Sequence, residues 1–224
     1  MLGSSQAVRR WPLKPLCEGS IPSSPTKFYM ISEKFLIVGA IVQVIGSLGY
    51  LIDTIKGKTQ PNRVTWLLWG IIPGIAFLSQ INQGVGAAAM FTFVIGFIPI
   101  VIFLATFLNK KAVWKLGRFD YVCGALAILG LILWFITKVG NLAILLSIIA
   151  DFFAAVPTLV KAYRNPESES YKDFLGSVIY GVITLLTLQQ WGFEYWGFAA
   201  YVVVFDSMLV YFIGLRPRLI MKRG

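Results

Sequence analysis

The sequence predicts an all-α integral membrane protein with seven transmembrane helices, built as two parallel three-helix repeats that a linker helix joins. Three observations lead to this fold class. The chain of 224 residues is 57% hydrophobic and only 13% charged, far more apolar than a soluble domain. Its apolar runs have no polar face, whereas a soluble helical protein needs amphipathic helices. Its second half also repeats the plan of its first half.

Each of the seven predicted helices is an apolar run close to the length of roughly 20 residues that a membrane span needs. Charged residues are concentrated between these runs, which sets the limits of each helix. In chain order the predicted helices are 35–55, 64–81, 87–108, 119–137, 141–163, 174–190 and 195–215.

The orientation follows from the basic residues, which lie in alternate connecting segments. The segments after the first, third and fifth helices and the C-terminal tail are basic, whereas the other segments hold only Lys138. Lysine and arginine favour the cytoplasmic side, so the C-terminus is predicted there and the N-terminus outside. The net charge of +10 is thereby explained without nucleic acid, and no nucleic-acid partner is expected. The basic residues are Lys56, Lys58, Arg63, Lys110, Lys111, Lys115, Arg118, Lys161, Arg164, Lys172, Arg216, Arg218, Lys222 and Arg223.

Residues 1–29 fit neither a signal peptide nor a helix, because they hold four prolines and no apolar core long enough to insert. They are expected to be disordered. One interpretation is an organellar presequence. The other is upstream sequence ahead of a true start at Met30, which we favour because it leaves only Glu33 and Lys34 outside the membrane.

The internal repeat appears when the chain is shifted by 107 or 108 residues, which superposes Gln43 on Asp151 and Gly74 on Gly181. Helix order and the charge of the loops support the repeat better than these few identities. The predicted units are an extension (1–29), a first repeat (30–108), a linker helix (109–140), a second repeat (141–215) and a basic cytoplasmic tail (216–224). Repeats of this kind are characteristic of membrane transporters.

A motif in the second half carries a family resemblance. Pro157-Thr158, followed by Lys161 and a Ser-rich segment, is similar to the Pro-Gln motif and Lys-containing loop of the SWEET and PQ-loop (MtN3-like) transporter superfamily. The first half has Gly49-Tyr50 at the equivalent place, so the chain resembles a divergent member. SWEET sugar carriers use four prolines in the first two helices of each repeat, of which only Pro73 and Pro157 are present here.

Two aspartates are the leading candidates for a site. Asp151 and Asp206 fall within apolar runs, where a carboxylate costs about 2.5–3.5 kcal/mol on insertion scales. Such a group can bind a proton or anchor a polar substrate, or it can be a neutral, structurally hydrogen-bonded acid. The resemblance implies that the last helix of each repeat gives a polar residue to a central cavity, which suits Asp206. Gln43 falls on Asp151 in the repeat, and it is therefore the residue of the first half that is expected to partner the aspartates of the second half.

Aromatic residues and prolines complete the candidate site. Trp66 and Trp69 lie in the first turns of the predicted second helix. They could form an aromatic platform for a substrate, or they could be interfacial anchors, which is the interpretation we favour. Tyr180 lies deeper and is a candidate for the cavity. Pro73 and Pro157 interrupt helices and are candidate hinges.

Three further aspartates, Asp53, Asp120 and Asp173, lie at helix ends beside basic residues. We interpret them as interfacial charges.

Several classes of function are excluded by missing residues. The chain has no histidine and two cysteines, Cys17 and Cys123, which excludes His-based triads and the usual zinc sites. The seventh helix contains no lysine for a retinal Schiff base. No nucleophile–base set or Gly-rich phosphate loop accompanies the aspartates, so neither an enzyme, a cofactor nor a metal site is expected.

The sequence therefore predicts a multi-pass protein of the plasma (inner) membrane that transports a small polar metabolite such as a sugar. It would act as a facilitator or a proton-coupled carrier, by alternating access between the two repeats. The alternatives are a vitamin- or nucleoside-type carrier and a non-transporting receptor or assembly protein of the same fold. The expected partners are the substrate and the lipid bilayer, and homo-oligomerisation is left open.

Overall fold

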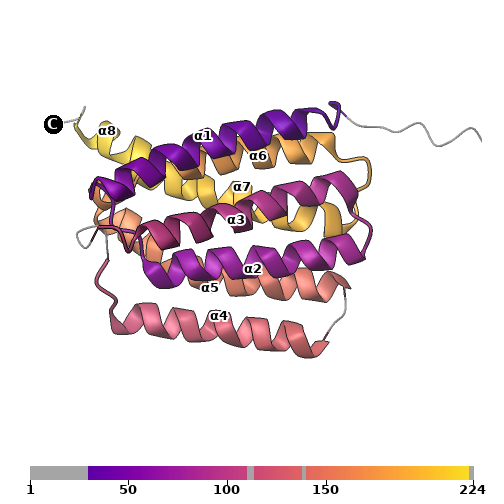
Figure 1. Ribbon diagram of the computed structural model, residues 1–224, viewed down its shortest axis with the longest axis horizontal. Coiled ribbons are helices and arrows are strands. Elements are labelled where there is room, and N and C mark those ends of the chain that lie inside the picture. The colour runs from indigo at the N-terminus through magenta and orange to yellow at the C-terminus, as the bar shows by residue number, and fades with distance from the viewer. Residues whose placement is uncertain (1–29, 110–113, 138–139, 222–224) are drawn as a thin grey trace, which may run out of the picture.

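The computed structural model describes residues 30–109, 114–137 and 140–221, and within these ranges all regular structure is helical (Figure 1). Both interpretations of residues 1–29 concern residues outside the described ranges. Five helical stretches are long and apolar enough to cross a membrane: Phe35–Ile55, Arg63–Asn82, Gly86–Ala105, Gly140–Arg164 and Phe193–Leu219. The predicted all-α class, with helices suited to a membrane, is confirmed at this level.

The helices begin and end close to the predicted limits. The helix predicted over 195–215 corresponds to α7 and a turn of π-helix, and α8 follows within the predicted basic tail. α6 has 16 residues and is shorter than the predicted run. The elements are α1 Phe35–Ile55, α2 Arg63–Asn82, the 3₁₀ turn Gly86–Ala88, α3 Ala89–Ala105, α4 Arg118–Thr137, α5 Gly140–Arg164, the 3₁₀ turn Pro166–Ser168, α6 Lys172–Thr187, α7 Phe193–Val210, the π turn Tyr211–Leu215 and α8 Arg216–Met221.

The helices form two groups of three with the same internal packing. We call α1–α3 the first trio and α5–α7 the second trio. In the first trio α3 packs against both α1 and α2, and in the second α7 packs against both α5 and α6. Between the trios α1 packs on α6 and α2 packs on α5, so exchanging the trios turns one contact into the other. α4 packs on α5 and α2 at the edge of the bundle (Figure 1).

The direction of the helices is also the same in both trios. α1, α3, α5 and α7 run one way, and α2, α4 and α6 run the opposite way (Figure 1). The segments 56–62 and 165–171 therefore lie at the same end of the bundle as α8. We call this the α8 end.

The outer surface of the bundle is much more apolar than that of a soluble protein, and several polar side chains are buried. Large apolar side chains such as Ile45, Leu104 and Val204 are exposed on the outside, whereas Gln43 and Asp151 are buried. An extended exposed apolar surface marks contact with a membrane or a partner. The polar groups must then interact with one another inside the bundle.

Glycines allow the two trios to approach closely where α1 meets α6. A Cβ atom on Gly39 would collide with the Tyr180 ring, and one on Gly46 with the backbone oxygen of Lys172. On α6, a Cβ on Gly176 would lie 2.8 Å from Oε1 of Gln43. Small residues of this kind bring membrane helices into direct backbone contact.

Candidate functional site

A cavity of about 30 Å³ lies between the two trios. This volume holds about two water molecules. The first trio supplies an amide, an indole and mostly apolar groups. The second trio supplies three carboxyl groups, two hydroxyls and four aromatic rings. The lining residues are Gln43, Trp69, Pro73, Ile95 and Pro99 from the first trio and Asp151, Asp173, Phe174, Ser177, Phe198, Tyr201, Val202, Phe205 and Asp206 from the second.

Each helix of the second trio contributes one carboxyl group to the cavity: Asp151 from α5, Asp173 from α6 and Asp206 from α7. Asp151 is 5% exposed, and its Oδ2 accepts a hydrogen bond from the Tyr201 hydroxyl at 2.9 Å. Its Oδ1 is buried without a hydrogen-bond partner among the described residues. The structure thus brings together the two aspartates that the sequence singled out and adds a third.

Asp173 is buried between the trios, contrary to its interpretation as an interfacial charge. It is 5% exposed and accepts hydrogen bonds from Nε2 of Gln43, at 3.1 Å, and from the Ser47 hydroxyl. Both donors lie on α1, so this carboxyl joins the trios where they are packed most closely. The basic neighbour Lys172 turns away and pairs with Asp53 at 2.6 Å instead.

Asp120 is also buried, contrary to its interpretation as an interfacial charge. Its Oδ1 accepts a hydrogen bond from Nδ2 of Asn62 at 2.6 Å, and its Oδ2 accepts one from the backbone N–H of Gly117 at 2.6 Å. Asn62 in turn caps α2, because its side-chain oxygen accepts from the backbone N–H of Val64 and Thr65. This carboxyl fixes the start of two helices and does not reach the cavity.

The shift that superposes the sequence halves also superposes residues that line the cavity. Gln43 corresponds to Asp151 at an offset of 108 residues, and Pro99 corresponds to Asp206 at an offset of 107. Ile95 and Val202 form a further pair at 107. Equivalent positions of the two halves therefore face the same space, with acids on one side only.

Three of the predicted site residues lie away from the cavity, whereas Trp69 and Pro73 line it. Trp66 is fully buried beside Tyr50, with ring centroids 4.8 Å apart, and so is not an interfacial anchor. Tyr180 is buried against Gly39 and Phe91. Pro157 lies within α5, and nearby the Thr65 hydroxyl donates to the carbonyl oxygen of Ala154 at 2.8 Å.

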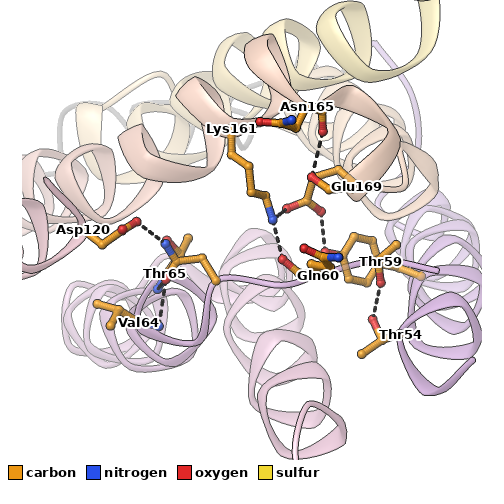
Figure 2. A network of polar contacts seen from close by, with 12 residues as sticks. Thr54, Thr59, Gln60, Val64, Thr65, Asp120, Lys161, Asn165 and Glu169 are labelled. Carbon is orange, nitrogen blue, oxygen red and sulfur yellow. Dashed lines mark hydrogen bonds and ion pairs between the residues drawn. The ribbon is translucent and has the colours of Figure 1, made fainter. Parts of the chain in front are cut away.

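A second polar cluster is buried at the α8 end (Figure 2). Lys161 and Glu169 form an ion pair in which both side chains are almost completely buried. The Lys161 ammonium also donates to the carbonyl oxygen of Gln60, and the Tyr50 hydroxyl donates to Oε2 of Glu169. In the sequence, Lys161 counts among the basic residues that mark the cytoplasmic side, and the structure places it, buried, near the end of α5.

These bonds connect the trios, and other bonds at the α8 end do the same. Tyr50 and Gln60 belong to the first half of the chain, and their partners belong to the second. The backbone N–H of Gln60 donates to the carbonyl oxygen of Ser168 at 2.8 Å. The Ser170 hydroxyl donates to Oδ2 of Asp53 at 3.3 Å, beside the ion pair of Asp53 with Lys172.

The opposite end is also joined across the trios, by fewer and more exposed bonds. The side chain of Gln189 donates to Glu33, and Nε2 of Gln80 donates to the carbonyl oxygen of Glu194 at 3.1 Å. The backbone N–H of Ile31 donates to the carbonyl oxygen of Leu186 at 3.3 Å. The cavity therefore lies between two sets of contacts that hold the halves together.

Comparison of the chain with family models, with curated proteins and with solved structures finds no match. Within the described residues, no group of three or more Cys, Asp or Glu side chains is placed so that it could hold a metal ion.

Proposed function

We propose that this protein is a membrane carrier that moves a small polar metabolite by alternating access between its two trios. It would span the membrane seven times, with the N-terminus outside and the α8 end in the cytoplasm, as a divergent relative of the SWEET and PQ-loop transporters. The observation that supports it most is the cavity between the trios, with one carboxyl group from each helix of the second trio. We propose no catalytic role for these carboxyls.

The position of the carboxyl groups supports a functional site. A charged side chain in the middle of a membrane helix is costly, and such residues usually mark substrate or proton pathways. Asp151 and Asp206 lie inside helices, and Asp173, at the start of α6, shares the same small space with them. One oxygen of Asp151 has no hydrogen-bond partner among the described residues. A purely structural role would be expected to satisfy a buried acceptor.

Transport through a cavity of this size would require movement. Ligand pockets usually measure about 300–1,000 Å³, whereas this cavity measures about 30 Å³. In the proposed cycle this is the closed state, and a substrate would reach the site only when the trios separate at one end. Opening toward the cytoplasm would break the Tyr50–Glu169 and Gln60–Lys161 bonds, with Pro73 and Pro157 as hinges.

The same aspartates allow two modes of transport. A facilitator would use them to orient the substrate, and a coupled carrier would use Asp151 or Asp206 to bind and release a proton in each cycle. The dependence of uptake on an imposed proton gradient distinguishes the two modes.

The proposal is tested by uptake into proteoliposomes with a panel of labelled sugars, amino acids and vitamins. Asp151→Asn and Asp206→Asn each keep the shape of the side chain and remove its charge, so both are expected to reduce uptake or its proton dependence. Uptake by both variants that equals that of the parent at every pH would make these aspartates structural.

The small volume also suits a protein that never opens, which makes a non-transporting receptor or assembly protein of the same fold the second candidate. A substrate stabilises the state that binds it, so a carrier should show a higher melting temperature with at least one solute of the panel. Neither stabilisation nor uptake with any solute would favour the second candidate.

A further inference from the structure

We infer that the cavity between the trios receives the positively charged ammonium group of a primary amine. This inference rests on the proposed carrier function and names the class of substrate for the same site. It departs from the sugar that the sequence suggested.

The charges around the cavity are the first argument. Asp151, Asp173 and Asp206 line it, and none of its described lining residues is a lysine or an arginine. The buried Lys161 is not available as a counter-charge, because it is paired with Glu169 at the α8 end. Opposite charges attract strongly where water is excluded, so a cation is favoured here and an anion is disfavoured.

The unsatisfied oxygen of Asp151 is the second argument. This carboxyl is 5% exposed, and Tyr201 donates to only one of its oxygens. The other oxygen, Oδ1, accepts no hydrogen bond of ordinary geometry from the described residues, although the Trp69 indole also interacts with this carboxyl. Oε1 of Gln43, on the opposite wall, is a second buried acceptor without a donor among the described residues. Both unsatisfied atoms accept hydrogen bonds, so the matching ligand group is a donor.

A primary ammonium group matches both the acidic lining and the two unsatisfied acceptors, since it carries a positive charge and three N–H donors. Hydrogen bonds between an ionised donor and a carboxylate are about twice as strong as neutral ones. A sugar hydroxyl can donate to Asp151 but brings no positive charge to balance an ionised carboxyl. An acid adds a further negative charge.

The aromatic lining is an independent third argument. Trp69 from the first trio and Phe174, Tyr201 and Phe205 from the second line the cavity. Aromatic faces attract cations, most strongly when both are removed from water, and they do not attract anions. The closed cavity has room for a head group of roughly the size of water, so the rest of the amine would be held in the open state.

The test compares three molecules that differ only in one end group: 4-aminobutan-1-ol is cationic, butane-1,4-diol is neutral and 4-hydroxybutyrate is anionic. Glucose is added as a neutral sugar. Melting temperatures of the purified protein in detergent and uptake into proteoliposomes are measured for all four. The inference predicts stabilisation and uptake with the amine, and at least tenfold weaker effects with the other three.

Variants then locate the site. Asp151→Asn should raise the apparent dissociation constant of the amine about tenfold or more, because a charged hydrogen bond is lost. Glu167→Gln removes the same charge from an exposed position outside the cavity and should leave amine binding unchanged. If Asp151→Asn does not fold, Asp206→Asn replaces it, and the comparison of the four solutes on the parent protein stands without any variant.

The outcomes separate this inference from the carrier proposal. Uptake of glucose or the diol without preference for the amine would contradict the amine as substrate class and would leave the carrier proposal standing. Equal amine binding by the parent and Asp151→Asn would show that the amine binds elsewhere, and would contradict the assignment of this cavity as its site. Absence of uptake of these solutes and of the wider panel, without any stabilisation, would overturn both.

Discussion

Two buried carboxyl groups of this protein are treated in opposite ways. Glu169, at the α8 end, has a lysine on one oxygen and a tyrosine hydroxyl on the other. Asp151, at the cavity, has a tyrosine hydroxyl on one oxygen and no partner among the described residues on the other. Both are almost completely buried. The first carboxyl joins the two halves of the chain, and the second is the one that the proposed function assigns to a ligand or a proton.

The largest expected effect is the loss of stability when the ion pair of Lys161 and Glu169 is broken. Glu169→Gln leaves the Lys161 ammonium buried without its counter-charge, which should cost about 3–5 kcal/mol of unfolding free energy. The melting temperature in detergent should fall accordingly. Adding Lys161→Met removes the stranded charge, so the double variant should recover most of the loss. A single variant as stable as the parent would contradict the pairing.

Asp173 is the intermediate case, because it lines the cavity and also accepts two hydrogen bonds from α1. Asp173→Asn exchanges bonds to a charged group for weaker neutral ones, at a cost of about 1–2 kcal/mol. Denaturation of the variant by a detergent titration measures this. A loss as large as that of Glu169→Gln would mean that Asp173 belongs with the structural carboxyls.

Thr65→Val tests the contact between α2 and α5. The hydroxyl donates to the Ala154 carbonyl oxygen close to Pro157, so its loss should cost about 1 kcal/mol and leave the cavity intact. The same denaturation assay gives the stability, and amine binding serves as the control. Weaker amine binding in this variant would show that the contact also shapes the site.

The smallest expected effect on stability is that of Asp151→Asn. The asparagine can still accept from Tyr201, and no hydrogen bond from the described residues to Oδ1 is lost, so stability should change by no more than about 0.5 kcal/mol or should rise. The measurement is the melting temperature without solutes. A loss comparable with that of Glu169→Gln would show that Asp151 is structural and would remove the contrast between the two sites.

The sequence was sufficient for the helices and for part of the site. Long apolar runs and alternate basic segments set the limits of most helices, because these depend on local composition. Asp151 and Asp206 were found because they interrupt apolar runs. Asp173 was missed because it lies beside Lys172 at a helix end, where a surface charge is the ordinary expectation.

A signal for the missing residues was present in the periodicity. Polar residues follow one another at spacings of four, three and four on α1 and again on α6, and all eight are buried. These spacings place them on one helix face, which marks the contact between the two trios. The polar residues are Gln43, Ser47, Tyr50 and Thr54 on α1 and Asp173, Ser177, Tyr180 and Thr184 on α6. The pairing of Lys161 with Glu169 depends on the path of the α5–α6 connection and has no such pattern.

The central claim, that this cavity opens in turn to each side of the membrane, is tested most directly with a cysteine at Ser177. Ser177 lines the cavity and is 3% exposed, and a cysteine there is nearly isosteric. In a background of Cys17→Ser and Cys123→Ala, a membrane-impermeant methanethiosulfonate reagent is added outside or inside the proteoliposomes. The account predicts modification from both sides, slowed in each case by a bound substrate. Modification from neither side, or from one side only, would contradict it.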